Sequence, residues 1–312
     1  YGRFAVPAFT PVFLNLSLIF AALVAAPWFE VPVFALAWGV LWPLSFFSKE
    51  TGVLFPLFAL AWELIVRRSA HGGLDRFARL LATATVLAAV AGVAYGLSPA
   101  GRWLWAGYEL RSFSLPERML TEGRVLWFYL GLMVLPRLEA LGLYHDDIAV
   151  STSLLEPWTT LPALVGLAGL AWLAWRARIQ APLLSFGIVW FLVGHGLEST
   201  VLPLEFAHEH RNYLPLFGIL LACVWGLARL LERGGPLRVL GISVAAAALL
   251  YLPFVTALRA HQFGDEIRRT QVEAQHHRDN CSTGTGLRPF LCSTPASSVT
   301  LLVFTRMITV AS

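Results

Sequence analysis

The chain is a series of apolar runs of membrane-spanning length separated by short polar connections. A bilayer core of about 30 Å needs roughly 20 apolar residues in a helix, and backbone groups in lipid must pair within the segment. No run alternates like a strand of a membrane barrel. The pattern therefore predicts an all-α, multi-pass transmembrane helix bundle. Eight runs are candidate spans: 9–28, 33–47, 52–66, 77–97, 159–175, 181–197, 213–231 and 239–258.

One further apolar stretch is too short to cross. Residues 125–136 are apolar for about a dozen positions before Arg137 and Glu139 interrupt them, which favours an interfacial or re-entrant helix. If this helix does not cross, the positive-inside tendency makes the face that collects most run-ending arginines cytoplasmic. The polar clusters then lie on the other face, so we expect one outward-facing site in a bacterial cytoplasmic (inner) membrane. The arginines of the cytoplasmic face are Arg67, Arg68, Arg76, Arg176, Arg178, Arg233 and Arg238.

Composition agrees with a membrane protein and argues against a nucleic-acid-binding one. Hydrophobic residues make up 57% of the chain and charged residues 13%, about half the charged share of a typical soluble domain. The net charge is +4, but the arginines are dispersed at the ends of apolar runs instead of forming a basic patch with aromatics. We therefore expect membrane lipids as partners and no nucleic acid.

The end of the chain differs in character from the rest. Residues 1–258 form the predicted membrane domain, and residues 259–280 are polar and compatible with a helix that leads into a soluble domain. Residues 281–312 contain no acidic residue and are rich in Ser and Thr, so we interpret them as a disordered or out-of-frame tail. The chain also starts at Tyr1 without a methionine, which is typical of a fragment.

The most informative motif is the charged cluster at 205–211, directly before the run 213–231. It gathers two imidazoles, two carboxylates and a guanidinium in a chain that is otherwise built for lipid, which points to function. Glu209 or His210 could take a proton from an acceptor hydroxyl, and Arg211 could hold a phosphate in a bidentate fork. Alternatively, His208, His210 and Glu205 could bind a divalent metal ion.

Four other residues carry candidate chemistry. The adjacent carboxylates Asp146 and Asp147 could serve as a base or as metal ligands, because they concentrate negative charge and raise one another's pKa. Lys49 is the one lysine of the chain and interrupts a nearly continuous apolar stretch. Lys49 and Arg124 are predicted, with Arg211, to bind the phosphate of a lipid-linked donor.

Two of these motifs carry a resemblance to a known family. Ser48-Lys49-Glu50-Thr51-Gly52 runs into an apolar segment with Pro56 and Glu63, and Glu209-His210-Arg211-Asn212-Tyr213-Leu214-Pro215 follows much later. Over roughly residues 30–280 the chain resembles bacterial multi-pass proteins related to the GT-C glycosyltransferases. More narrowly, it is similar to the transmembrane and tetratricopeptide-repeat-containing O-mannosyltransferases.

The resemblance implies an activity at the outer membrane face. The expected reaction transfers a sugar from a polyprenyl-phosphate donor to a protein or glycan acceptor. By motif position, Lys49 and Arg211 match the basic residues near the donor phosphate. The family's acidic catalytic residue in the first external loop would precede this chain, and its tetratricopeptide array would follow it.

Three other functions remain open from the residues. An O-antigen ligase or polymerase would use outer-face arginine and histidine to hold a polyprenyl-diphosphate glycan. A non-catalytic membrane scaffold would present a repeat domain. A transporter is disfavoured, because the sequence shows no clear internal repeat and no clear charge in the middle of a span.

Overall fold

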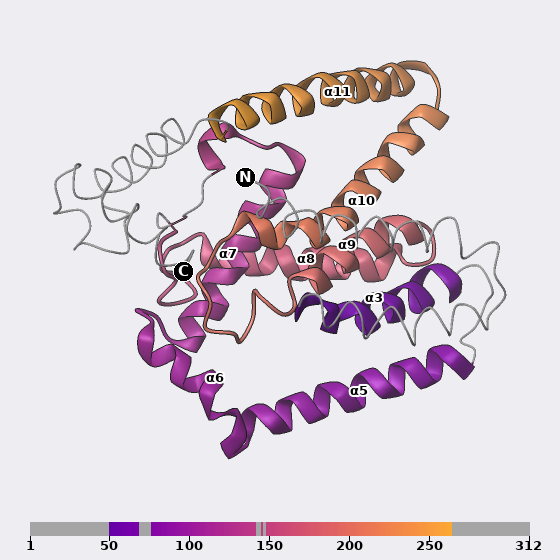
Figure 1. The fold of residues 1–312 in the computed structure, drawn as a ribbon. Helices are drawn as coiled ribbons and strands as arrows, with labels where there is room; N and C mark the ends of the chain where they lie inside the picture. Colours follow the sequence, from indigo (N-terminus) through magenta and orange to yellow (C-terminus); the bar gives the residue numbers. More distant parts are fainter. Residues whose placement is uncertain (1–49, 69–75, 142–144, 146–147, 264–312) are drawn as a thin grey trace, which may run out of the picture. The chain divides into compact units, whose positions relative to one another are not determined.

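The computed structural model describes residues 50–68, 76–141, 145 and 148–263. Every regular element in these ranges is a helix, which confirms the predicted all-α class. The predicted spans 9–28 and 33–47, the lead-in after residue 263 and the tail 281–312 lie outside the described residues. Figure 1 shows the elements: η2 (Glu50–Leu54), α3 (Phe55–Ala61), η3 (Trp62–Arg67), α5 (Arg76–Leu97), η4 (Pro99–Gly101), α6 (Arg102–Ala106), η5 (Gly107–Leu110), α7 (Leu115–Val134), η6 (Leu138–Ala140), α8 (Thr160–Ala177), α9 (Pro182–Gly194), η7 (Glu209–Asn212), α10 (Tyr213–Glu232) and α11 (Gly235–Phe263).

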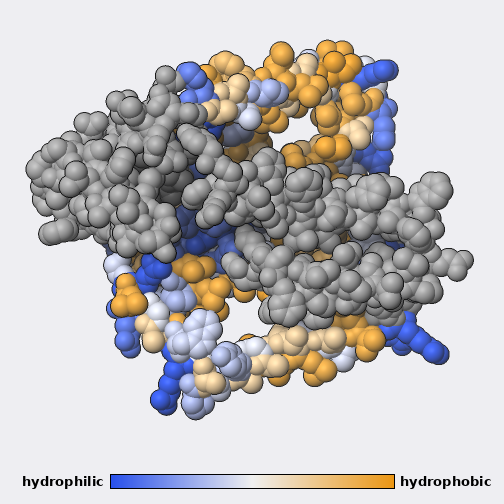
Figure 2. All heavy atoms as spheres, viewed as in Figure 1, coloured by the Kyte–Doolittle hydropathy of each residue, from blue (hydrophilic) through white to orange (hydrophobic). Residues whose placement is uncertain are grey.

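Four helical segments of the described chain are long and apolar enough to cross a membrane. They are Ala78–Leu97, Thr160–Ala177, Glu209–Glu232 and Gly235–His261, and they match the predicted runs 77–97, 159–175, 213–231 and 239–258. The run 181–197 forms the shorter apolar helix Pro182–Gly194, and the run 52–66 is divided among η2, α3 and η3. Hydrophobic residues cover much of α5 and α11 (Figure 2). The chain is therefore a multi-pass membrane protein.

The chain divides into two compact units. Unit 1 comprises Tyr1–Glu109, Gly169–Leu202 and His210–Trp225, and unit 2 comprises Leu110–Ala168, Pro203–Glu209 and Gly226–Ser312. The division passes through the charged cluster between residues 209 and 210, so the two parts of that cluster belong to different units.

Unit 1 is built around aromatic and glycine contacts. Trp190 of α9 stacks on Phe58 of α3 with ring centroids 4.0 Å apart, and its Nε1 donates to the carbonyl of Leu214 at 2.7 Å. Gly187 of α9 meets Gly218 of α10 so closely that a Cβ on either residue would collide with the carbonyl of the other. Small residues of this kind allow membrane helices to pack backbone to backbone.

Unit 2 is organised around α7, which begins earlier than the apolar stretch 125–136. Ser114 and Glu117 form a capping box, in which a Glu117 carboxylate oxygen accepts from the Ser114 amide at 2.7 Å and from its hydroxyl at 2.8 Å. The Ser114 side chain in turn accepts from the backbone amide of Glu117, so the box satisfies amide groups that the first turn leaves without helical partners. The Trp127 indole then donates to the carbonyl of Ala163 at 2.9 Å and ties α7 to α8. None of the candidate membrane spans among the described residues includes α7.

Candidate functional site

The segment 203–209 of unit 2 holds the first part of the charged cluster. Its backbone is held by side chains from α7 and from the turn before it. Arg111 Nε donates to the carbonyl of Pro203 at 2.9 Å, and Arg118 Nη1 donates to the carbonyl of Leu204. The Tyr129 hydroxyl accepts from the His208 amide at 2.6 Å and donates to the His208 carbonyl at 3.2 Å. The path of this segment is therefore set by main-chain hydrogen bonds.

Arg118 is the central residue of this attachment. It is fully buried and forms an ion pair with Glu122 Oε1 at 2.8 Å, one turn further along α7. Its guanidinium carbon also lies about 6 Å from the rings of Phe113 and Phe206, which pack together with centroids 4.3 Å apart. The buried guanidinium needs this carboxylate, because an uncompensated charge in the interior is costly.

The attached backbone presents an imidazole–carboxylate pair. His208 Nε2 lies 2.7 Å from Glu205 Oε2, and Arg111 Nη1 lies 4.0 Å from the other Glu205 oxygen. Glu205 is exposed and His208 is partly exposed, so both side chains reach solvent. A pair of this kind can relay a proton between an acceptor hydroxyl and water.

Glu209, the last residue of unit 2 in this segment, faces a histidine from elsewhere in the chain. His145 Nε2 lies 3.8 Å from Glu209 Oε1, and the buried His145 ring packs edge-on against Phe128 with centroids 5.1 Å apart. Sequence reasoning gave His145 no role, although its place beside Asp146 and Asp147 was a signal. Asp146 and Asp147 lie outside the described residues, as does Lys49.

The metal hypothesis is not strengthened by the geometry. Within the ranges that the structure describes, no group of three or more His, Cys, Asp or Glu residues could hold a metal ion. His208 and Glu205 are in contact, whereas His210 is exposed on η7 and belongs to unit 1. Binding of a metal by His208, His210 and Glu205 stays a prediction.

Arg211, predicted to bind phosphate, forms a buried ion pair in unit 1. Its Nε lies 3.2 Å from Glu198 Oε2, and both side chains are less than a tenth exposed. Glu198 follows α9 and Arg211 lies on η7, so the pair joins the two segments that lead out of and into the apolar helices. A phosphate at Arg211 would have to compete with, or add to, this carboxylate.

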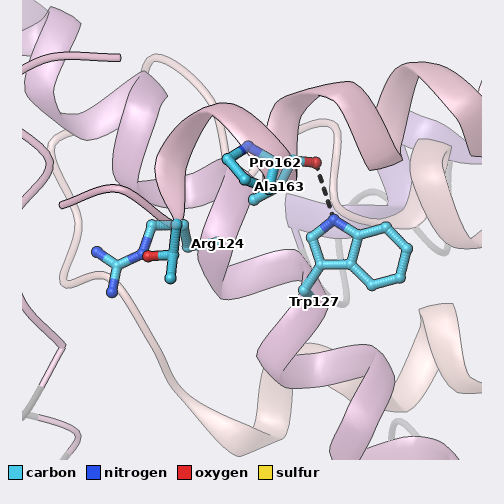
Figure 3. A pocket seen from close by; sticks show the side chains of 5 residues that line it. Arg124, Trp127, Pro162 and Ala163 are labelled. Carbon is cyan, nitrogen blue, oxygen red and sulfur yellow. Dashed lines mark hydrogen bonds between the residues drawn. The ribbon is translucent and has the colours of Figure 1, made fainter. Parts of the chain in front are cut away.

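Arg124, the third predicted phosphate ligand, lines an open groove between α7 and α8 in unit 2. The groove has a volume of about 500 Å³ and is also lined by Trp127, Thr159, Pro162 and Ala163 (Figure 3). Arg124 Nη1 donates to the carbonyl of Ala149 at 2.7 Å and lies 3.5 Å from Ser151 Oγ. Partial burial lowers the pKa of this guanidinium from its usual value.

Comparison with known proteins gives one partial likeness of interest. A protein of Burkholderia cenocepacia that is named lipid II flippase MurJ is 30% identical to this chain over 167 residues. The matched region covers 49% of this chain and 31% of that protein, so the chain spans about a third of the relative's length. No family model and no solved structure matches the chain. The likeness agrees with a multi-pass membrane protein.

Proposed function

We propose that this chain is the membrane part of a glycosyltransferase. It would transfer a sugar from a polyprenyl-phosphate donor to a protein or glycan acceptor at the outer face of the bacterial cytoplasmic membrane. The observation that carries the proposal is the held segment 203–209. Its backbone is bonded to the side chains of the turn before α7 and of α7, while Glu205, His208 and Glu209 keep side chains suited to proton transfer. Acid–base groups on a preorganised backbone are typical of catalytic sites.

The proposed chemistry needs one proton acceptor. The acceptor hydroxyl oxygen bonds to the anomeric carbon of the sugar, and the bond from that carbon to the phosphate oxygen breaks. The hydroxyl proton passes to the base, and polyprenyl phosphate leaves with the electron pair of the broken bond. Among the described residues, Glu209 is our preferred base, because His145 lies beside its carboxylate and would orient it. His210, Asp146 and Asp147 remain the alternative bases, and Lys49, Arg211 and Arg124 the proposed phosphate ligands.

Turnover of the full-length protein in lipid nanodiscs tests this function. The assay supplies a polyprenyl-phosphate sugar and an acceptor, and it follows donor consumption. Glu209→Gln should slow consumption by about 100-fold or more, because a positioned base contributes on that order. Glu232→Gln is the matched control, since Glu232 is exposed at the end of α10 and forms an exposed ion pair with Arg229. Failure of the wild-type protein to consume any such donor would overturn the proposal.

A second candidate function is lipid transport, and the partial likeness to a protein named lipid II flippase favours it. Proteoliposomes with a fluorescent polyprenyl-diphosphate lipid separate the two candidates. Transport exposes the lipid to an external quencher and leaves it chemically unchanged, whereas transfer breaks the bond between phosphate and sugar. A strict need for a diphosphate donor, with bond cleavage, would instead indicate the O-antigen ligase or polymerase reaction. Absence of both activities would favour a scaffold.

A further inference from the structure

A loop directly before the candidate span Thr160–Ala177 carries large apolar side chains that the protein leaves uncovered. In this loop, residues 152–159, Leu154 is 51% exposed, Leu155 is 70% exposed and Trp158 is 75% exposed. Large apolar side chains that gather on one exposed segment mark a surface that binds a partner. The loop is therefore a candidate interaction surface outside the charged cluster.

Backbone hydrogen bonds hold the two leucines at the tip of the loop. The amides of Thr152 and Ser153 both donate to the carbonyl of Glu156, at 3.0 and 3.3 Å. The Leu155 amide donates to the Ser153 hydroxyl oxygen at 3.3 Å. The chain thus turns back on itself around Leu154 and Leu155. The exposure of these side chains is a property of a closed turn with its own hydrogen bonds.

The base of the loop is fixed at the level where the span begins. The Ser151 amide donates to Thr121 Oγ1 of α7 at 2.8 Å. The Ser151 hydroxyl oxygen lies 2.8 Å from that of Thr160, the first residue of α8. All three residues are fully buried, and a satisfied buried polar network of this kind is rigid. The apolar tip is therefore presented on a stiff support.

The tip lies close to the lipid-facing surface of the span. Leu155 precedes Thr160 by five residues, so their Cα atoms are at most about 18 Å apart. Leu161 and Val165 of the span are themselves exposed, so the apolar surface of α8 begins directly after the loop. Trp158 stands two residues before the span, where tryptophan rings settle at the level of the headgroups. The exposed apolar surface is thus continuous in sequence from the loop into the membrane.

We propose that the loop 152–159 inserts into the bilayer, in the leaflet where α8 begins. Leu154 and Leu155 enter the boundary between headgroups and acyl chains, and Trp158 lies among the headgroups. The partner of this surface is lipid, because the surface that it continues is the one that the span turns to lipid.

Insertion of the loop sets the depth of the charged segment 203–209 in the membrane. Ser151 links the loop to Thr121 on α7, and Tyr129 further along α7 holds the backbone of His208. A loop anchored in one leaflet therefore keeps this part of α7, and the segment bonded to it, at a constant level. The inference goes beyond the proposed function, since it holds whether or not the protein transfers a sugar.

Glu156 makes the insertion sensitive to lipid charge. It is the one charged residue between Ile148 and Trp175, and its exposed side chain directly follows the two leucines. Anionic lipids give the membrane a negative surface potential, which repels a carboxylate among the headgroups. The loop should therefore lie deeper in phosphatidylcholine than in phosphatidylglycerol.

The accessibility of a spin label measures this insertion. Full-length protein with its native cysteines replaced by serine receives one nitroxide label through Leu155→Cys and is placed in phosphatidylcholine nanodiscs. Oxygen concentrates in hydrocarbon, whereas a neutral nickel chelate stays in water. Oxygen should therefore relax the label several times more strongly than nickel does. Val165→Cys, exposed on the candidate span, is the lipid-facing control, and Arg233→Cys, exposed in the turn between α10 and α11, is the water-facing control.

Two results would contradict insertion. Stronger relaxation by nickel at Leu155, as at Arg233, would place the loop in water. Weak relaxation by both reagents would mean that a second copy or another protein covers the loop. Because the readout needs neither donor nor acceptor, a protein without sugar transfer can still show insertion, and the two proposals fail separately.

A second comparison tests the role of Glu156. Replacing phosphatidylcholine with phosphatidylglycerol should raise the relaxation by nickel at Leu155→Cys, and the additional change Glu156→Gln should abolish that rise. An equal rise with and without Glu156→Gln would show that the carboxylate does not set the depth of the loop.

Discussion

The hydroxyl of Tyr129 is bonded to both main-chain polar groups of His208. It accepts from the amide at 2.6 Å and donates to the carbonyl at 3.2 Å, across 79 positions of sequence. Tyr129 has no exposed surface, so water cannot substitute for it easily. A single side chain on α7 thus fixes one peptide unit of the charged cluster.

The variant Tyr129→Phe should loosen the segment 203–209 without unfolding the protein. It removes the buried hydroxyl and leaves the His208 amide and carbonyl without this partner, which costs about 1–3 kcal/mol. We expect faster amide exchange at 204–209 and a lower kcat, with the binding of polyprenyl phosphate unchanged. The control Tyr213→Phe removes an exposed hydroxyl on α10. Unchanged exchange at 204–209 would show that Tyr129 does not hold the segment.

Arg118 and Glu122 should be strongly coupled in stability. Arg118→Met leaves the Glu122 carboxylate buried without its cation, which should cost about 3–5 kcal/mol. The double variant Arg118→Met with Glu122→Leu should recover much of that loss, because no charge then remains buried. Thermal unfolding in detergent measures both variants.

A double-mutant cycle on the exposed pair Arg229 and Glu232 is the matched control. The coupling free energy of that pair should be about 1 kcal/mol or less. Additive effects of Arg118→Met and Glu122→Leu would contradict the buried pair. The double variant should still lose the bond to the Leu204 carbonyl, so its turnover should stay low even where its stability returns.

The start of α7 should depend on pH through Glu117. Hydrogen bonds from the amide and hydroxyl of Ser114 hold the pKa of Glu117 below its usual value of 4.5. Because the pKa is lower in the folded state, this stabilisation is present above pH 4.5 and is lost as the pH falls through the lowered value. Ser114→Ala should cost about 1 kcal/mol at pH 7 and less at acidic pH, as measured by unfolding midpoints. Equal loss at both pH values would show that the Ser114 hydroxyl does not lower the pKa of Glu117.

Close packing of α9 on α10 should depend on Gly218. Gly218→Ala adds a Cβ against the Gly187 carbonyl and the Cβ of Trp190, and overpacking of this kind costs about 1–3 kcal/mol. Gly226→Ala is the control on the same helix, because its Cβ would meet nothing within 4 Å. The control should be neutral or gain up to about 1 kcal/mol from helix propensity. Equal stability of the two variants would show that the helices can separate.

The long apolar helices were predictable, and the start of α7 was less so. The runs 77–97 and 159–175 nearly coincide with Ala78–Leu97 and Thr160–Ala177, since a continuous apolar run has one stable form in lipid. Helix α7 begins at Leu115, before its apolar stretch, where its face is polar. Ser114 followed by Pro116 and Glu117 was the capping signal that marks this start.

The candidate site was predictable in composition but not in pairing. Charge density alone identified the cluster 205–211, whereas the contact of His145 with Glu209 joins distant parts of the sequence. The sequence alone does not single out Arg118, although its position one turn before Glu122 permits an ion pair on a helix. Its full burial follows from tertiary packing, which a single sequence does not record.

The hydrogen bonds that hold the segment 203–208 constrain its main chain and leave its side chains free to differ. Arg111, Arg118 and Tyr129 reach the main chain of Pro203, Leu204 and His208, and a carbonyl group is the same whichever residue carries it. Side chains at 205 and 208 can therefore be exchanged while the backbone keeps its course. An engineer could use this segment to install other reactive groups in the same place.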